Sequence, residues 1–373
     1  MDALAQQLDQ RSSPGQLYES LSNGDVRCHA CAHRCLIKPG GRGICMVRFN
    51  RDGILMVPWG YVAALQVDPI EKKPLYHFLP GEAALTFGML GCDFHCDYCQ
   101  NWVTSQALRD DAARVSGRYI RGIDAESIIA YGQRMGATVV ASSYNEPLIT
   151  AEWAHAIFER AQAAGMKSVF ISNGFATPET LDFLKPVLDG YKVDLKSMRP
   201  EVYRDLGGRL QPVLDTIRAA YEREMWVEVV TLVVPGLNDS IEELMSAARY
   251  ISSISPDIPW HVTAFHRDYR MTDRDNTSSE LLLRAAEIGQ EAGLKYVYAG
   301  NLPGVLSEYE HSYCPQCQVP VIERRGFFVT GYHLDDQGCC PQCGTQIPGV
   351  WLASAGVQVS DAPGFTGRHP QIL

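Results

Sequence analysis

Residues 84–99 read Ala84-Leu85-Thr86-Phe87-Gly88-Met89-Leu90-Gly91-Cys92-Asp93-Phe94-His95-Cys96-Asp97-Tyr98-Cys99. The first part of this stretch predicts a short strand, because it is built mainly of aliphatic and aromatic residues. Three cysteines follow directly, with the spacing Cys-x-x-x-Cys-x-x-Cys. Cysteines this close together in a reducing compartment usually share a metal, since a short loop can turn their thiolates toward one centre. The stretch therefore predicts a metal site on a loop that leaves a strand.

This group offers three thiolates, Cys92, Cys96 and Cys99, and no fourth cysteine lies nearby in the sequence. A [4Fe–4S] cluster normally takes four thiolates. Three protein ligands would leave one iron open to a small molecule, as three ligands leave a catalytic zinc open. The alternative is a zinc site that His95 completes.

The spacing, with the aromatic Tyr98 just before the last cysteine, resembles the motif of the radical S-adenosylmethionine (SAM) superfamily. The resemblance implies that Cys92, Cys96 and Cys99 bind a [4Fe–4S] cluster whose open iron holds the amino and carboxylate groups of SAM. An electron from the reduced cluster would cleave the sulfonium and release a 5′-deoxyadenosyl radical, which abstracts a hydrogen atom. The protein's task would be to position the reacting atoms and exclude water and oxygen. The same resemblance implies a flavodoxin- or ferredoxin-type electron donor.

Strands and helices alternate after this loop. We expect strands at residues 138–143, 167–172, 190–195, 226–234, 258–264 and 294–299, which are short β-branched or aromatic runs. Helix starts are expected at Thr177-Pro178 and at a capping box, Thr277-Ser278-Ser279-Glu280. The alternation implies an α/β fold with parallel strands and right-handed crossovers. Because the glycine fingerprint of dinucleotide-binding folds is missing, a partial TIM-like (β/α)6 barrel is favoured over a doubly wound sheet.

Polar residues stand where the expected strands end, which is where βα barrels carry their functional groups. These residues are Asn145 and Glu146, Ser172 and Asn173, Asp194 and Lys196, and His266. The strand-end sequences resemble those of the pyruvate formate-lyase activating enzyme group of radical enzymes. That resemblance implies that Asp194, Lys196 and His266 line a SAM site and that Tyr98 lies beside the adenine.

The loop after the second strand departs from that group. In the group, Gly-Gly-Glu usually holds the amino group of the methionine moiety, whereas this chain has Tyr144-Asn145-Glu146-Pro147. Asn145 and Glu146 are therefore predicted to take that role, with Ser172 and Asn173 on the next strand end. Structural alternatives stay open, because Asp194 and Lys196 could form a surface ion pair and the other residues could serve turns.

The N-terminal cysteines, Cys28, Cys31, Cys35 and Cys45, form a second group. Four thiolates suit either zinc or a closed [4Fe–4S] cluster that relays electrons. Some activating enzymes carry relay clusters inserted after the triad, and this chain has no such insert. A structural metal is the favoured prediction.

A third group lies near the C-terminus. Cys314-Pro315-Gln316-Cys317 and Cys340-Pro341-Gln342-Cys343 are two Cys-x-x-Cys pairs, a pattern typical of a zinc ribbon. We choose Cys340 over Cys339 as a ligand because Cys-Pro-Gln-Cys then occurs twice. Four thiolates leave no open position, so this site is predicted to be structural.

We expect three units: an N-terminal Cys-rich segment over residues 1–80, a core barrel over 81–304, and a C-terminal zinc-ribbon domain over 305–373. Together with Gly300-Asn301-Leu302-Pro303-Gly304, this layout resembles the radical SAM enzyme of the AmmeMemoRadiSam system along essentially the full chain. The resemblance implies AmmeMemo-type partner proteins.

Net charge and hydropathy disfavour two classes of binding partner, nucleic acids and membranes. The chain of 373 residues has 33 Lys and Arg against 43 Asp and Glu, a formal net charge of −10 at pH 7. An acidic protein gains no general attraction to a phosphate backbone, so nucleic acid is disfavoured as a partner. No apolar run approaches the roughly 18–20 residues that cross a bilayer, and the N-terminus lacks the features of a signal peptide. The prediction is a cytoplasmic protein that binds no membrane.

The leading functional hypothesis is a radical SAM oxidoreductase that resembles activating enzymes and removes a hydrogen atom from a protein or peptide. Two alternatives stay open. One is a radical SAM enzyme that modifies RNA, since zinc ribbons often accompany nucleic acid binding. The other is a non-enzymatic zinc-binding module in which all three cysteine groups are structural.

Overall fold

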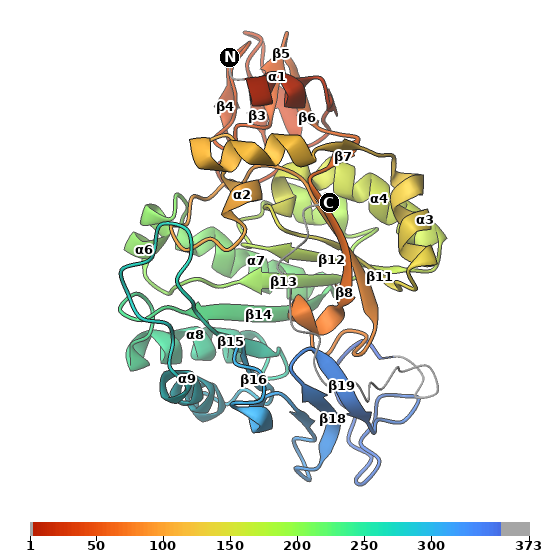
Figure 1. Ribbon diagram of the computed structural model, residues 1–373, viewed down its shortest axis with the longest axis vertical. Helices are drawn as coiled ribbons and strands as arrows, with labels where there is room; N and C mark the ends of the chain where they lie inside the picture. The colour runs from red at the N-terminus through yellow and green to blue at the C-terminus, as the bar shows by residue number, and fades with distance from the viewer. Residues whose placement is uncertain (1–2, 352–373) are drawn as a thin grey trace.

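A computed structural model describes residues 3–351 of the chain, and its centre is an eight-stranded sheet of order β16-β15-β14-β13-β12-β11-β9-β8 (Figure 1). The strands are β8 (Ala64–Pro69), β9 (Ala83–Gly88), β11 (Val139–Ser142), β12 (Lys167–Ser172), β13 (Gly190–Asp194), β14 (Trp226–Val233), β15 (Trp260–Ala264) and β16 (Val297–Gly300). From β9 to β16 the neighbours pair in parallel, and the order does not close into a full barrel. This confirms the α/β class and the partial barrel.

One strand of the sheet departs from the expected pattern. β8 pairs antiparallel with β9 over the register Ala64↔Gly88 to Pro69↔Ala83 and forms the edge of the sheet. Most of its residues are half-buried, and it mixes apolar with polar side chains. This strand was not expected from the sequence, because it is defined by pairing with a neighbour rather than by burial on both faces.

The helices follow the strands in the expected alternation. They are α2 (Trp102–Ser105), α3 (Ala125–Arg134), α4 (Ala151–Ala163), α5 (Pro178–Leu184), α6 (Pro200–Asp205), α7 (Leu210–Glu222), α8 (Ile241–Ile254) and α9 (Ser279–Glu291). Thr177 caps α5 as predicted, since its hydroxyl accepts from the amide of Thr180.

The predicted capping box at residues 277–280 is wrong by one residue. Ser278 is the N-cap of α9 and accepts from the amide of Leu281. The Thr277 hydroxyl instead donates to the Val233 carbonyl at 2.6 Å and accepts from the Phe265 amide at 2.8 Å. Thr277 therefore ties the ends of β14 and β15 together, a tertiary role that sequence spacing does not reveal.

The N-terminal segment lies at the top of Figure 1, and its buried residues share one hydrophobic core with the barrel. Its elements are α1 (Ala3–Asp9), β1 (Ser12–Pro14), β2 (Tyr18–Ser20), β3 (Val26–Cys28), β4 (Leu36–Ile37), β5 (Phe49–Arg51) and β6 (Ile54–Pro58). They form two three-stranded sheets, β1-β6-β5 and β2-β3-β4. A further pair, β7 (Tyr61–Val62) with β10 (Arg121–Gly122), links the segment to the core.

A buried ion pair fastens this segment to the barrel. Arg48 donates from both terminal nitrogens to Glu152 of α4 at 2.7 Å, and each side chain is 1% exposed. The Arg48 guanidinium also reaches the Ile149 carbonyl at 3.1 Å, and Glu152 accepts from the amides of Gln16 and Leu17. Such a pair is stabilised by this bidentate geometry, so losing one partner leaves a buried charge without compensation.

The C-terminal unit lies at the opposite end of the molecule, drawn in blue in Figure 1. It contains β17 (Ser312–Tyr313), β18 (Pro320–Arg325) and β19 (Phe328–Tyr332) in one antiparallel sheet. Residues 352–373 of the predicted C-terminal domain lie outside the described residues. No helix within residues 3–351 is long and apolar enough to cross a membrane.

His77 joins the C-terminal unit to the core. Its Nδ1 lies 2.7 Å from the Pro348 carbonyl, and its Nε2 lies 2.5 Å from the hydroxyl of Tyr298. A neutral ring satisfies both contacts when Nδ1–H donates and Nε2 accepts. Burial lowers the pKa of His77 to about 4.

We predict that Arg48→Ala lowers the free energy of unfolding by about 3–5 kcal/mol, because Glu152 is left buried and unpaired. Urea unfolding followed by tryptophan fluorescence measures the loss. Arg27→Ala is the control: its ion pair with Glu19 is exposed, and removing it should cost about 1 kcal/mol or less. Equal losses in the two variants would contradict a special role for the buried pair.

We also predict a pH dependence that His77 causes. Its folded pKa lies below the unfolded value of about 6.5, so its contribution to stability is complete above that pH and declines as the pH falls toward the folded pKa. Between about pH 7 and pH 5 the loss should be about 2 kcal/mol. His77→Asn removes the titrating ring, so the unfolding free energy of the variant should fall less steeply over that interval in urea titrations. Parallel slopes for the two proteins would exclude His77 as the cause.

Candidate active site

The three-cysteine loop leaves the carboxyl end of β9 at Gly91. This glycine has φ +98°, and a Cβ placed on it would lie 2.9 Å from Cγ1 of Val47 and 3.2 Å from the Cys45 carbonyl oxygen. Both the left-handed backbone and the close approach therefore require glycine. The N-terminal segment is consequently packed directly against the start of the loop.

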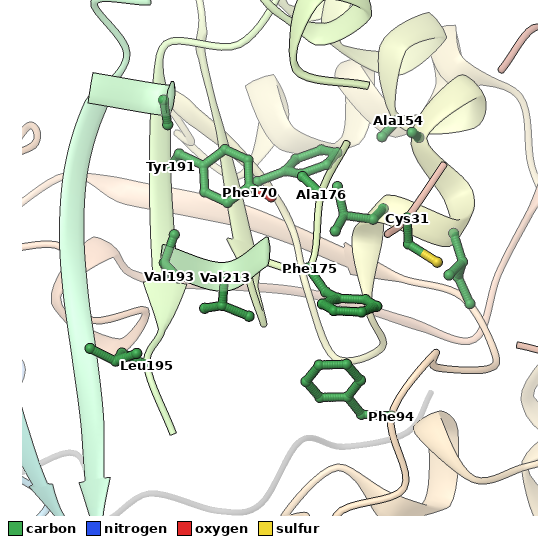
Figure 2. Packing of buried hydrophobic residues seen from close by; sticks show 14 of the residues in the cluster. Cys31, Phe94, Ala154, Phe170, Phe175, Ala176, Tyr191, Val193, Leu195 and Val213 are labelled. Atoms are coloured by element: carbon green, nitrogen blue, oxygen red, sulfur yellow. The ribbon is translucent and has the colours of Figure 1, made fainter. Parts of the chain in front are cut away.

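The loop is held from the other side by aromatic packing. Phe94 is 1% exposed, and its ring centroid lies 5.2 Å from that of Phe175. Figure 2 shows these two rings one above the other, with Cys31 near Phe175. A Cβ on Gly208 would lie 2.4 Å from the Phe94 ring, so this glycine leaves room for the loop.

The thiols of Cys92, Cys96 and Cys99 carry no disulfide. Burial is the largest cause that raises the pKa of each thiol, and the charge of Asp93 adds to it at Cys92. A thiolate is the form that binds metal, and such buried thiols ionise only when a cation compensates them. Cys96 is buried and Cys92 and Cys99 are half-buried, so three thiols on one loop fit the predicted iron–sulfur cluster.

A connected polar group lies beside Cys92 at the ends of β11 and β12. Glu146 accepts from the Ser172 hydroxyl at 2.7 Å, from the Asn173 amide at 2.7 Å and from the Leu148 amide at 3.0 Å. Asn145 accepts from the Met89 amide at 2.9 Å through its side-chain oxygen. The structure thus brings together the four residues that the sequence analysis expected on these two strand ends.

Glu146 is a buried carboxyl group with both oxygens engaged. Burial, and then the charge of Asp93, raise its pKa to about 8. The hydrogen bonds that it accepts hold the exit of β12 against the exit of β11. Its predicted contact with SAM stays a prediction, and its observed contacts are those of a positioning residue.

Asp93 joins this group to the cysteine loop. Its Oδ1 accepts from the Asn173 side chain at 2.8 Å and lies 3.7 Å from the Sγ of Cys92. Its side chain is fully buried, and the His33 ring lies 3.2 Å from its carbonyl oxygen. Asp93 carries no sequence signal for this role, because its partners come from segments far along the chain.

Asp194 and Lys196 lie on the other side of the loop. Lys196 Nζ is 3.7 Å from Asp194 Oδ2, and the shorter ion pair of Asp194 is with Lys192. Of the nearby charged groups, Lys196 has the largest effect on the pKa of Cys96, which it lowers. Tyr98 is buried, which raises the pKa of its hydroxyl, and the same ammonium counters that rise. The predicted pair is therefore half-buried beside the cysteine loop. Lys192 was missed, although a residue two positions before Asp194 on a strand shares its face.

His266 follows β15 and is exposed. Its Nε2 lies 2.9 Å from the side-chain nitrogen of Gln100, the residue after Cys99. The loop that begins at His266 lies over the cysteine loop: the amides of Arg270 and Met271 both donate to the Asp97 carbonyl, at 2.9 and 3.0 Å. The structure thus brings His266 to the same site, through a neighbour that carried no sequence signal.

The C-terminal thiols form a tighter group. Among the described residues, only Cys314, Cys317, Cys340 and Cys343 form a group of three or more Cys, His, Asp or Glu ligand atoms all within 4.8 Å of one another. The Sγ atoms of Cys314 and Cys343 lie 3.5 Å apart, and those of Cys317 and Cys340 lie 3.6 Å apart. A tetrahedral zinc with Zn–S of about 2.3 Å separates its thiolates by about 3.8 Å. The four residues are therefore a four-Cys metal site of zinc size.

Comparison with known proteins identifies the core. Residues 87–248 match the radical SAM superfamily. An uncharacterized protein of Methanocaldococcus jannaschii is 37% identical over 333 residues, 88% of this chain and 97% of that protein. The isethionate sulfite-lyase activating enzyme of Desulfovibrio desulfuricans is 24% identical over 180 residues, 46% of this chain and 56% of that enzyme. A solved domain of a pyruvate-formate lyase-activating enzyme from Bacteroides vulgatus is 21% identical, covers 43% of this chain and 98% of that domain, and has a TM-score of 0.39.

We predict that Cys340→Ser lowers the zinc content of the purified protein by about one atom per chain, because a four-thiolate site loses a ligand. Metal analysis by plasma mass spectrometry measures zinc and iron together. Cys339→Ser is the matched control, since Cys339 bonds to Gln346 rather than to the other thiols. Loss of iron with unchanged zinc in Cys340→Ser would contradict the assignment.

Proposed function

The chain belongs to the radical SAM superfamily, and from that membership we propose that it is an activating-enzyme-like oxidoreductase that removes a hydrogen atom from a protein or peptide. Membership implies a [4Fe–4S] cluster and SAM as cofactors. When bound, the reduced cluster would supply the electron, and SAM would be cleaved to methionine and the 5′-deoxyadenosyl radical. The chain's own residues hold the pair and keep water from it.

The observation that carries the proposal is the convergence of three strand ends on one cysteine loop. The loop has one buried and two half-buried thiols, and the polar side chains that end β11, β12 and β13 lie beside it. Three thiolates leave one coordination position for a small-molecule ligand. The polar side chains around that position supply donors and acceptors for the amino and carboxylate groups of SAM.

Individual roles follow from these positions. We assign Lys196 to the carboxylate of SAM, because its ammonium is the charge that lowers the pKa of Cys96 most. We assign Asp194 and Asn145 as acceptors of hydrogen bonds from SAM. Tyr98 is assigned to a contact with the adenine. Ser172 and Asn173, which bond to Glu146, position the strand exit. His266 is assigned to the rim of the site, since it is exposed next to Gln100.

A protein or peptide substrate is favoured over RNA. One relative is named an isethionate sulfite-lyase activating enzyme, and the net charge of −10 disfavours binding to a phosphate backbone. We further propose that the chain belongs to the AmmeMemoRadiSam family and acts with AmmeMemo-type partner proteins. We also propose that it works in the cytoplasm. We also propose that the chain divides into three units, at residues 1–80, 81–304 and 305–373. The last of these would hold zinc.

The test is SAM cleavage under anaerobic conditions. Protein reconstituted with iron and sulfide, reduced with dithionite and given SAM should form 5′-deoxyadenosine, measured by liquid chromatography. The variant with Cys92→Ala, Cys96→Ala and Cys99→Ala should form none, because it has no ligands for the cluster. Cys339→Ser should match the wild type.

Two results would contradict the proposal. Equal product from the wild type and the triple variant would remove the cysteine loop from the reaction. A reconstituted wild type that contains zinc but no iron or sulfide would indicate the non-enzymatic module. An electrophoretic mobility shift of RNA by the protein that weakens as salt increases would instead favour the RNA-modifying alternative.

A further inference from the structure

The proposed function leaves four buried or partly buried cysteines without a role. Cys28, Cys31 and Cys45 are 6–7% exposed, Cys35 is partly exposed, and none forms a disulfide. They lie in the N-terminal segment that packs on the start of the triad loop. Four free thiols gathered in one short segment are a ligand set.

The spacing of these thiols separates two kinds of metal. Among residues 3–351, only the four C-terminal cysteines bring ligand atoms together within 4.8 Å. Within the described part of the chain, neither the N-terminal group nor the triad brings three ligand atoms within that distance, and superfamily membership assigns the triad to a [4Fe–4S] cluster. A cuboidal cluster holds its thiolates farther apart than zinc does, because each thiolate binds a different iron, whereas the thiolates of zinc converge on one ion.

The two wide groups meet at one side chain. Asp93 Oδ1 lies 3.7 Å from the Sγ of Cys92, and the Asp93 carboxylate also forms a side-chain hydrogen bond with the thiol of Cys31. Asp93 is fully buried, so no bulk solvent separates the two thiols at this point. A triad ligand and an N-terminal ligand thus face the same carboxylate.

Several contacts fix this approach. The Ala32 amide donates to the Phe175 carbonyl at 2.9 Å, and the Arg209 guanidinium donates to the Ala32 carbonyl at 2.6 Å. Arg109 donates to the Phe94 carbonyl at 2.8 Å and to the Ile44 carbonyl at 2.6 Å. Arg109 therefore clamps the triad loop to the N-terminal cysteine loop.

The group also has an inner and an outer side. Cys31 faces Asp93, whereas Cys35 is partly exposed and accepts from the Ile44 amide at 3.4 Å. Ile44 and Leu36, next to Cys35, are 48% and 52% exposed. One ligand of the group therefore lies toward solvent and another toward the triad.

We propose that Cys28, Cys31, Cys35 and Cys45 hold a second [4Fe–4S] cluster that passes electrons past Asp93 to the triad cluster. One electron leaves the N-terminal cluster, which is oxidised from [4Fe–4S]+ to [4Fe–4S]2+. The triad cluster gains it and is reduced from [4Fe–4S]2+ to [4Fe–4S]+. A flavodoxin- or ferredoxin-type donor reduces the N-terminal cluster again on the side of Cys35. This inference rests on the proposed function and adds an electron entry route to it; of the two metals that the sequence left open, it takes the relay cluster in place of the structural metal.

The first test uses the variant with Cys92→Ala, Cys96→Ala and Cys99→Ala, which leaves only the N-terminal set. After anaerobic reconstitution it should retain about half of the wild-type iron and sulfide, about four atoms of each. Its reduced electron paramagnetic resonance spectrum should show a cluster that SAM does not alter, because four thiolates leave no open iron. Zinc in place of iron at these thiols would overturn the proposal.

A second test measures coupling of the clusters. In fully reduced wild type, the two paramagnetic clusters should broaden each other's resonance signals, and this broadening should vanish in either single-cluster form. Cys35→Ser is the milder N-terminal variant, since Cys35 is partly exposed. It should perturb the N-terminal signal and slow triad reduction by reduced flavodoxin while dithionite still reduces the triad. Unchanged signals and unchanged flavodoxin kinetics in Cys35→Ser would overturn the relay.

These readouts separate the two proposals. Iron in the triad-free variant tests the N-terminal cluster whether or not the triad cleaves SAM. Failure of SAM cleavage with iron present in both groups would contradict only the proposed function. Cys339→Ser, outside all three ligand sets, should keep the iron content and both signals of the wild type.

Discussion

The parallel pairing of β9, β11 and β12 is the constraint on which the site depends. Ser142 pairs with Phe87 on one side and with Phe170 on the other, so the three strands end at one level. Polar side chains that follow each strand must then meet at one edge, together with the cysteine loop that follows β9. Hydrogen bonds from Ser172 and Asn173 to Glu146 lock this arrangement.

Two buried carboxyl groups at the site are held by hydrogen bonds. Asp93 and Glu146 are two buried carboxyl groups, and burial followed by the charge of Asp93 raises the pKa of Glu146 to about 8. Among the residues that the structure describes, no Arg or Lys forms an ion pair with either of them as Arg48 does with Glu152. Amide and hydroxyl donors satisfy them instead, which is the usual requirement for polar groups taken out of water. The ordering of these loops thus depends on hydrogen bonds rather than on ion pairs.

The two cysteine-rich ends serve the core differently. The C-terminal group is tight and lies at the far end of the molecule from the N-terminal segment (Figure 1). Its unit is joined to the core through His77 and Tyr298. The N-terminal group does not bring three ligand atoms within 4.8 Å of one another, and its segment packs against the start of the triad loop at Gly91. Spacing and position, rather than cysteine count, distinguish the two groups.

The sequence by itself determined the features that depend on near neighbours: the triad loop after its strand, the alternation that predicts the parallel sheet, and the paired Cys-Pro-Gln-Cys motifs. It missed β8, whose signal lies in pairing, and Lys192, whose face is shared with Asp194. Tertiary folding brings Asp93 into contact with both Cys92 and Cys31, and into a hydrogen bond with Asn173, 80 residues away. Such contacts arise when strands bring distant loops together, and no spacing along the chain encodes the distance between side chains on separate strands.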